Sequence, residues 1–285
     1  MIVWCEAAQT QDVRRKAKMK LDIVEELAKH SFIGKVMDDI YPLLFEPVPE
    51  NARLINKDET LEKAKKILSP TDWYSYDVFR KQGALTLAFT RMIQAHAFLQ
   101  RFPSPKTYER SFAITNMDWL EYHFLMYMVS VVTTSDCVLI LTNSVFRLGL
   151  KDGNCNQSSI VENMRVIESK LSPDLKHYLK ITGKYRDIRN VHLHRASGKS
   201  VADILESQEL KFIGTLSFLD LHTTLELPQT VIKDGYQVAT DKLIEIIESD
   251  SSKLVDQLMK IFGILEMIYL EKKYILNESP TNTCV

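Results

Sequence analysis

Residues 184–195 bring together side chains that can bind a phosphate group and move protons around it. The segment reads KYRDIRNVHLHR and holds four cations and two imidazoles, in a chain whose formal net charge is −1. On a helix each residue turns by about 100°, so Arg186, Asn190 and His194 form one row. Arg189 lies beside this row. Guanidinium, carboxamide and imidazole groups around a patch of this size predict phosphate recognition.

The two histidines of the segment point in different directions if it is helical. His192 and His194 are two residues apart, which turns a helix by about 200°, so they do not form a chelating pair. On an extended strand they would share a face, but no carboxylate or cysteine spacing nearby completes a zinc set. We therefore expect no metal and no other cofactor. A charged helix face is often only solvated, and the pattern alone leaves that interpretation open.

Long helices are expected to position this segment. The SPD run at residues 172–174 predicts the start of a helix that passes through the candidate row and stops near Gly198. Residues 118–148 form a predicted core helix, closed by a GLKDGNC run whose glycines and asparagine favour a helix stop. Residues 241–276 carry apolar side chains at helical spacing. We expect this last helix to lie antiparallel to the core helix and in contact with it.

The first hundred residues are predicted to be helices separated by prolines. Residues 12–27 have the spacing of an amphipathic helix, and Pro42 is the first of several prolines expected to break the chain after it. The SPTDW run at residues 69–73 predicts a further helix start, leading to Leu99.

These patterns predict an all-α fold, an antiparallel helical bundle with one departure. Residues 211–232 are rich in β-branched and aromatic side chains and predict a short β-hairpin inserted into the bundle. The predicted domains are an N-terminal helical region of unknown role at 1–107, the bundle at 108–276 and a flexible tail at 277–285.

Residues 124–146 are long and apolar enough to span a bilayer, yet the sequence favours a core helix. Asp136 lies near the centre of the segment, where a carboxylate costs about 2.5 to 3.5 kcal/mol on insertion scales. The first residues lack the charged start and apolar run of a signal peptide. The four cysteines form no C-x-x-C pair. We expect a cytoplasmic protein with reduced thiols and no membrane partner.

The candidate row also carries a resemblance to a known family. The run RNVHLH at residues 189–194 resembles the R-N-x-x-x-H form of the R-x4-6-H motif of the HEPN superfamily (higher eukaryotes and prokaryotes nucleotide-binding). HEPN domains are all-α bundles with two long helices and the motif on a later, shorter helix. The layout predicted for residues 108–276 is similar.

The resemblance implies a metal-independent endoribonuclease whose active site forms from two copies of the motif across a symmetric homodimer. It implies proton transfer by His194, charge stabilisation by Arg189, and a phosphate-positioning or His194-ordering role for Asn190. The implied products carry 2′,3′-cyclic phosphate ends, and the implied ligand is RNA or a nucleotide. HEPN proteins often have defence or toxin roles. The chemistry agrees, because metal-free RNA cleavage needs a base, an acid and a cation.

Three assignments stay open. Arg186 and His192 also have a permitted motif spacing and give a second register. Tyr185 can stack a nucleic-acid base or belong to the core. Asp136 can pair with a motif arginine, hold His194 in place, or form a purely structural pair.

Two other classes of function also stay open. A HEPN fold can serve without catalysis as a nucleotide or RNA sensor or as a scaffold, and a helical bundle can be a protein-interaction module. A net charge of −1 fits these better than RNA processing does, because RNA-processing surfaces usually carry more positive charge.

Overall fold

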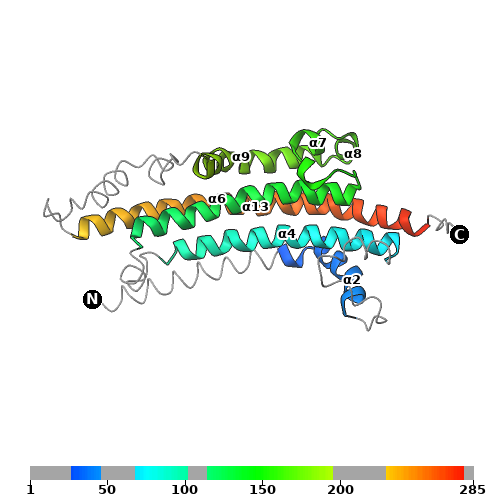
Figure 1. The fold of residues 1–285 in the computed structure, drawn as a ribbon, viewed down its shortest axis with the longest axis horizontal. Helices are drawn as coiled ribbons and strands as arrows, with labels where there is room; N and C mark the ends of the chain where they lie inside the picture. Colours follow the sequence, from blue (N-terminus) through cyan, green and yellow to red (C-terminus); the bar gives the residue numbers. More distant parts are fainter. Residues whose placement is uncertain (1–26, 46–67, 102–113, 195–228, 279–285) are drawn as a thin grey trace. The chain divides into compact units, whose positions relative to one another are not determined.

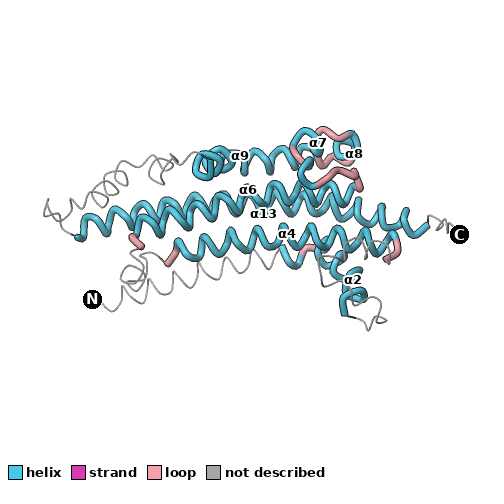
Figure 2. The backbone as a smooth tube through the Cα atoms, viewed as in Figure 1, coloured by secondary structure: helices cyan, strands magenta, loops and turns pink. Residues whose placement is uncertain are grey.

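The described part of the chain is helical. The computed structural model describes residues 27–45, 68–101, 114–194 and 229–278 (Figure 1). The helices in these ranges are α2 (Ser31–Phe45), α4 (Pro70–Leu99), α6 (Asn116–Phe146), the short 3-10 helix η3 (Asp152–Asn154), α7 (Gln157–Val161), α8 (Met164–Glu168), α9 (Ser172–His194) and α13 (Gln229–Glu278). No strand occurs in the described ranges (Figure 2). The prediction of an all-α fold is confirmed.

Some predictions fall partly or wholly outside the described ranges. The helix at residues 12–27 and the stop at Gly198 lie outside them, apart from Leu27. Of the segment predicted as a hairpin, residues 229–232 form the start of α13, and the remainder is not described. Pro42 does not break the chain as expected, because it lies inside α2. Since α2 ends at Phe45, the proline disturbs only its last turn.

Two long helices begin at side-chain caps. The Ser69 hydroxyl accepts the N–H of Asp72 at 3.1 Å and donates to its carboxylate at 2.7 Å. Thr115 and Asp118 repeat this arrangement at the start of α6, at 3.1 and 2.6 Å. Each pair satisfies backbone N–H groups that the first helical turn leaves without partners. The start predicted at SPTDW is confirmed by α4, and the start predicted at SPD is confirmed by α9.

The end of α6 follows from the residues after it. Arg147 and Gly149 both have left-handed backbone angles, with φ of 52° and 76°. The Asn143 side chain donates to the carbonyl of Leu150 at 2.9 Å, and its oxygen accepts the N–H of the same residue at 3.1 Å. The side chain thereby replaces helix partners that the chain loses here. The GLKDGNC run predicted a helix stop here, and Gly149 of that run has the positive φ expected of it.

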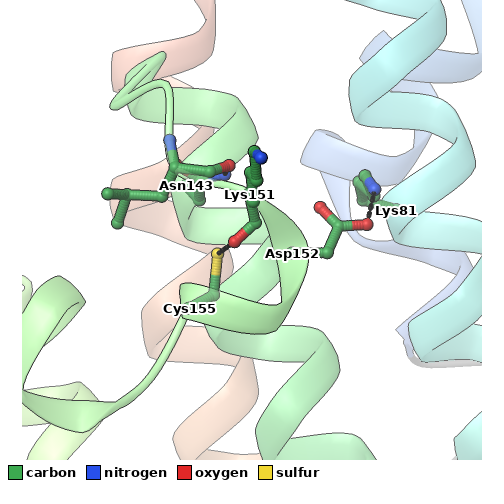
Figure 3. Close-up of polar contacts among 6 residues, drawn as sticks. Lys81, Asn143, Lys151, Asp152 and Cys155 are labelled. Carbon is green, nitrogen blue, oxygen red and sulfur yellow. Dashed lines mark hydrogen bonds and ion pairs between the residues drawn. The ribbon is translucent and has the colours of Figure 1, made fainter.

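The loop after α6 is held by further polar contacts, drawn in Figure 3. The Lys81 ammonium forms an ion pair with Asp152, which joins α4 to η3. The Cys155 thiol donates to the carbonyl of Lys151 at 3.5 Å. Burial raises the pKa of this thiol, so Cys155 acts as a small buried hydrophobe.

Contacts divide the chain into two compact units, to which α4, α6, α9 and α13 all contribute. Unit 1 contains Met1–Ala17, Ala88–Thr133 and Lys180–Leu254, and unit 2 contains Lys18–Leu87, Thr134–Leu179 and Val255–Val285. Within each unit these four helices alternate in direction in chain order (Figure 1). This alternation is that of an antiparallel bundle.

The helices α6 and α13 run in the same direction within each unit, as the colour order in Figure 1 shows. They are in contact, since in unit 1 the Tyr127 hydroxyl donates to the carbonyl of Ile247 at 3.4 Å. The expected contact is therefore confirmed, but the expected antiparallel direction of this pair is wrong. In chain order α9 lies between the two helices, and two reversals return the chain to its first direction.

In unit 2, α2 packs against α13 through aromatic rings. The ring of Phe32 lies 5.5 Å from that of Phe262 and 5.9 Å from that of Tyr269. The Tyr269 hydroxyl lies 2.7 Å from the Asp39 carboxylate and 2.8 Å from the Ser75 hydroxyl, which links α2, α4 and α13.

Among the described residues α6 is the one helix long and apolar enough to cross a membrane. Its apolar residues are used for packing inside the protein, because 61% of its most apolar window is buried. Tyr127, Val131, Leu141 and Val145 have no exposed surface. The helix is therefore accounted for as a core helix, as the sequence predicted.

Candidate functional site

The helix α9 carries the candidate row at its C-terminal end, in unit 1. Its backbone is helical through His194, so Arg186, Asn190 and His194 follow one another at intervals of about one turn. The same geometry places His192 about 200° from His194 around the helix axis. Side chains are described up to Asn190 and not for residues 191–194.

Arg189 and Asn190 interact directly. The guanidinium donates to the carboxamide oxygen of Asn190 from Nη2 at 2.9 Å and from Nε at 3.2 Å. The carboxamide oxygen of Asn190 is a hydrogen-bond acceptor, and it already accepts from the Arg189 guanidinium. The pair therefore offers N–H donors, which suits an anion such as a phosphate.

Tyr185 fixes the rotation of α9. Its side chain is 3% exposed, and its hydroxyl donates to the carboxylate of Asp250 on α13. Its ring meets that of Tyr127 on α6 edge to face, with centroids 5.7 Å apart. Tyr185 was interpreted either as a base-stacking residue or as a core residue, and in the structure it lies in the core.

The inward position of Tyr185 turns the candidate row outward. Counted from Tyr185 at about 100° per residue, Arg186 lies about 100° away, Asn190 about 140° and His194 about 180°. Arg189 lies about 40° away, on the flank of the buried face, and it is half-buried. From Arg186 to His194 the row therefore moves step by step away from the buried face of α9, and the Arg186 and Asn190 side chains are half-buried.

A buried polar cluster surrounds this tyrosine. Asp250 is 5% exposed and accepts from Tyr185 and from the Lys184 ammonium. The Tyr127 hydroxyl lies 3.2 Å from that of Ser251. Burial, together with the neighbouring phenol and carboxylate, raises the pKa of Tyr185 well above its ordinary value. Burial likewise raises the pKa of Tyr127. The cluster joins α6, α9 and α13 by directional bonds, which apolar contacts alone do not supply.

The chain matches a known protein family. A family model described as HEPN_Cthe2314-like HEPN matches residues 74–249, which is more than half of the chain. The chain belongs to the HEPN superfamily. The resemblance of residues 189–194 to the HEPN motif thus stands within a HEPN domain. No curated protein and no solved structure was found to match the chain.

In this HEPN chain Asp136 belongs to unit 2, whereas the other candidate residues belong to unit 1. Its neighbour Thr134 accepts the Tyr178 hydroxyl of α9 at 2.8 Å. Asp136 follows two residues later, about 200° around α6 from that contact. It lies near Cys137, whose pKa is raised mainly by burial and further by this carboxylate. A role of Asp136 beside the motif stays a prediction.

The cluster of Tyr127, Lys184, Asp250 and Ser251 was not predicted from the sequence. A signal was present, because Asp250 and Ser251 stand three and four residues after the buried Ile247. A helical apolar stripe would place apolar residues there. A polar pair at such positions indicates a buried partner.

No group of three or more histidine, cysteine, aspartate or glutamate side chains able to hold a metal occurs in the part of the HEPN chain that is described. The side chains of His192 and His194 lie outside that part.

Proposed function

We propose that this HEPN protein is a cytoplasmic, metal-independent endoribonuclease. Two copies of residues 189–194, one from each chain of a two-fold dimer, form its active site. The observation that carries the proposal is the Arg189–Asn190 donor pair, on a helix whose buried Tyr185 turns the candidate row outward.

The reaction needs a base, a cation and an acid. The base removes the proton of a ribose 2′-hydroxyl, and the resulting oxygen attacks the adjacent phosphorus. The P–O5′ bond then breaks, and the acid protonates the leaving 5′-oxygen. The products carry a 2′,3′-cyclic phosphate and a 5′-hydroxyl. A histidine titrates near neutrality and suits proton transfer, and an arginine suits the charged phosphorane.

We assign proton transfer to His194, charge stabilisation to Arg189 and the holding of a phosphate oxygen to Asn190. The bond from Arg189 to Asn190 supports a joint role, because it holds the two groups side by side, where one anion can contact both. Arg186 and His192 form the alternative register. One chain supplies one imidazole on the row, whereas the acid and the base are two groups. A two-fold axis close to the row brings in the second.

The test is cleavage of a mixed RNA pool in EDTA, with the product ends identified. We expect cyclic phosphate ends from the wild type and none from His194→Ala or Arg189→Ala. Loss of a general acid or base slows such reactions by roughly a hundredfold to ten-thousandfold. The matched control is His177→Ala, an exposed histidine of the same helix that belongs to unit 2. Full activity of His194→Ala together with loss in His192→Ala would move the site to the other register.

A second candidate is a HEPN protein that binds RNA or a nucleotide without cutting it. The net charge of −1 favours it. Protection of the fold against heat by a nucleotide, without cleavage of any RNA, would select this function.

A further inference from the structure

A pocket in unit 2 is not used by the chemistry proposed above. It has a volume of about 640 Å³, within the range of sites for small organic ligands, and it lies between the ends of α6 and α8 and the side of α13. Phe146, Ile268 and Ile275 supply its apolar lining. Arg147 and Arg165 are its two arginines.

The charges of the pocket are only partly compensated. The Lys272 ammonium lies 3.0 Å from the Glu271 carboxylate, so these two largely cancel. Within the described ranges neither Arg147 nor Arg165 forms an ion pair. The exposed residue Glu168 also lines the pocket, and its carboxylate is a hydrogen-bond acceptor there. The lining therefore carries a net positive charge and two available guanidinium groups.

The backbone at Arg147 closes α6 beside the pocket. Its φ of 52° lies in the left-handed region, where glycine is the ordinary residue. The other non-glycine residue with positive φ in the described ranges is Lys170, which directly follows the pocket residue Ser169. Each of the two residues follows a helix end: the N–H of Leu148 donates to the carbonyl of Asn143, and that of Leu171 donates to the carbonyl of Val166. This conformation therefore caps α6 and α8 and holds the two helix ends at the pocket.

We propose that this pocket binds a small phosphate monoester with an apolar or aromatic body. A phosphate monoester carries a charge of about −1.5 to −2 near pH 7 and three acceptor oxygens, which the guanidinium groups of Arg147 and Arg165 complement. The body contacts Phe146 and the two isoleucines, and Glu168 accepts a hydrogen bond from a hydroxyl or amine of the body. This site shares no residue with the proposed ribonuclease site and does not depend on it.

The probe is naphthyl phosphate, titrated by fluorescence into the full-length protein. We expect saturable binding to the wild type, competition by inorganic phosphate, and no binding of naphthol at the same concentration. Arg147→Gly and Arg165→Gln each remove a charge-assisted hydrogen bond and weaken binding roughly tenfold to a hundredfold. Arg147→Gly also relieves the backbone, so its melting temperature is expected to equal or exceed that of the wild type.

Two controls separate this site from other anion sites. Arg80→Gln removes an exposed arginine of α4 in the same unit, and Arg91→Gln removes an exposed arginine of α4 in unit 1. Both should bind naphthyl phosphate as the wild type does. The proposal is overturned if the wild type does not bind the probe or if the two pocket variants bind it unchanged. It is also overturned if Arg91→Gln abolishes binding.

Discussion

At the scale of single residues, the position of α9 depends on hydrogen bonds as well as on apolar packing. Tyr185 and Asp250 are both nearly inaccessible to solvent and bind each other, and Lys184 adds its charge to the same carboxylate. A buried carboxylate that loses a donor retains the cost of its desolvation. The tyrosine therefore supports the direction of the candidate row although it does not belong to the row.

The first prediction concerns this bond. Tyr185→Phe keeps the ring and removes the donor to Asp250, so we expect the free energy of unfolding to fall by about 1 to 3 kcal/mol. Urea unfolding followed by circular dichroism measures it. Tyr122→Phe is the control, because Tyr122 is 61% exposed, and it should change stability by less than about 0.5 kcal/mol. Equal stability of the two variants would contradict the assigned bond.

The second prediction concerns alkaline pH. The pKa values of Tyr127 and Tyr185 are raised in the folded protein, so the unfolded chain loses these protons first. The free energy of unfolding should stay constant below about pH 10. Above that pH it should decrease by about 1.4 kcal/mol per pH unit for each such tyrosine. Urea unfolding between pH 8 and 11 tests this. The slope should be smaller in Tyr185→Phe. Stability that is constant across this range would contradict the raised pKa values.

At the scale of the elements, the starts of α4 and α6 follow from their own capping residues. The third prediction is that Ser69→Ala lowers stability by about 0.5 to 2 kcal/mol, since α4 loses its side-chain cap. Ser69→Asn should retain most of the stability, because asparagine caps equally well. Thermal unfolding of both variants measures the difference. An asparagine variant as unstable as the alanine variant would argue against the cap.

Features encoded by neighbouring residues could be predicted from the sequence, and features that depend on distant packing could not. The starts of α4 and α9 and the end of α6 were predicted because capping and left-handed residues act locally. The start of α13 was missed, because the residues before 241 have weak helix propensity. In the folded chain the burial of Tyr236, Ala239 and Thr240 outweighs that propensity. The shared direction of α6 and α13 depends on the helix between them, which apolar spacing does not reveal.

At the scale of the whole molecule, membership of the HEPN superfamily accounts for the helical fold over residues 74–249. The candidate residues Arg189, Asn190, His192 and His194 could be selected from the sequence because they are contiguous, and their roles stay predictions. The supporting cluster could not be assembled, because Tyr127, Tyr185 and Asp250 meet only when three helices pack. The domain boundaries at residues 107 and 276 stay predictions.

The fourth prediction concerns assembly. A composite active site requires a dimer at working concentration, so sedimentation at micromolar concentration should give about twice the mass of one chain. A strict monomer that still cleaves RNA would contradict a site built from two chains.

The most direct test of the composite active site is the activity of mixed dimers. Wild-type and His194→Ala chains are co-refolded in defined ratios at constant total concentration, and RNA cleavage is measured in EDTA. If each site needs an imidazole from both chains, only wild-type homodimers are active. An equal mixture then retains about one quarter of the wild-type rate, and activity follows the square of the wild-type fraction. Activity proportional to the wild-type fraction, about one half in the equal mixture, would contradict the composite site.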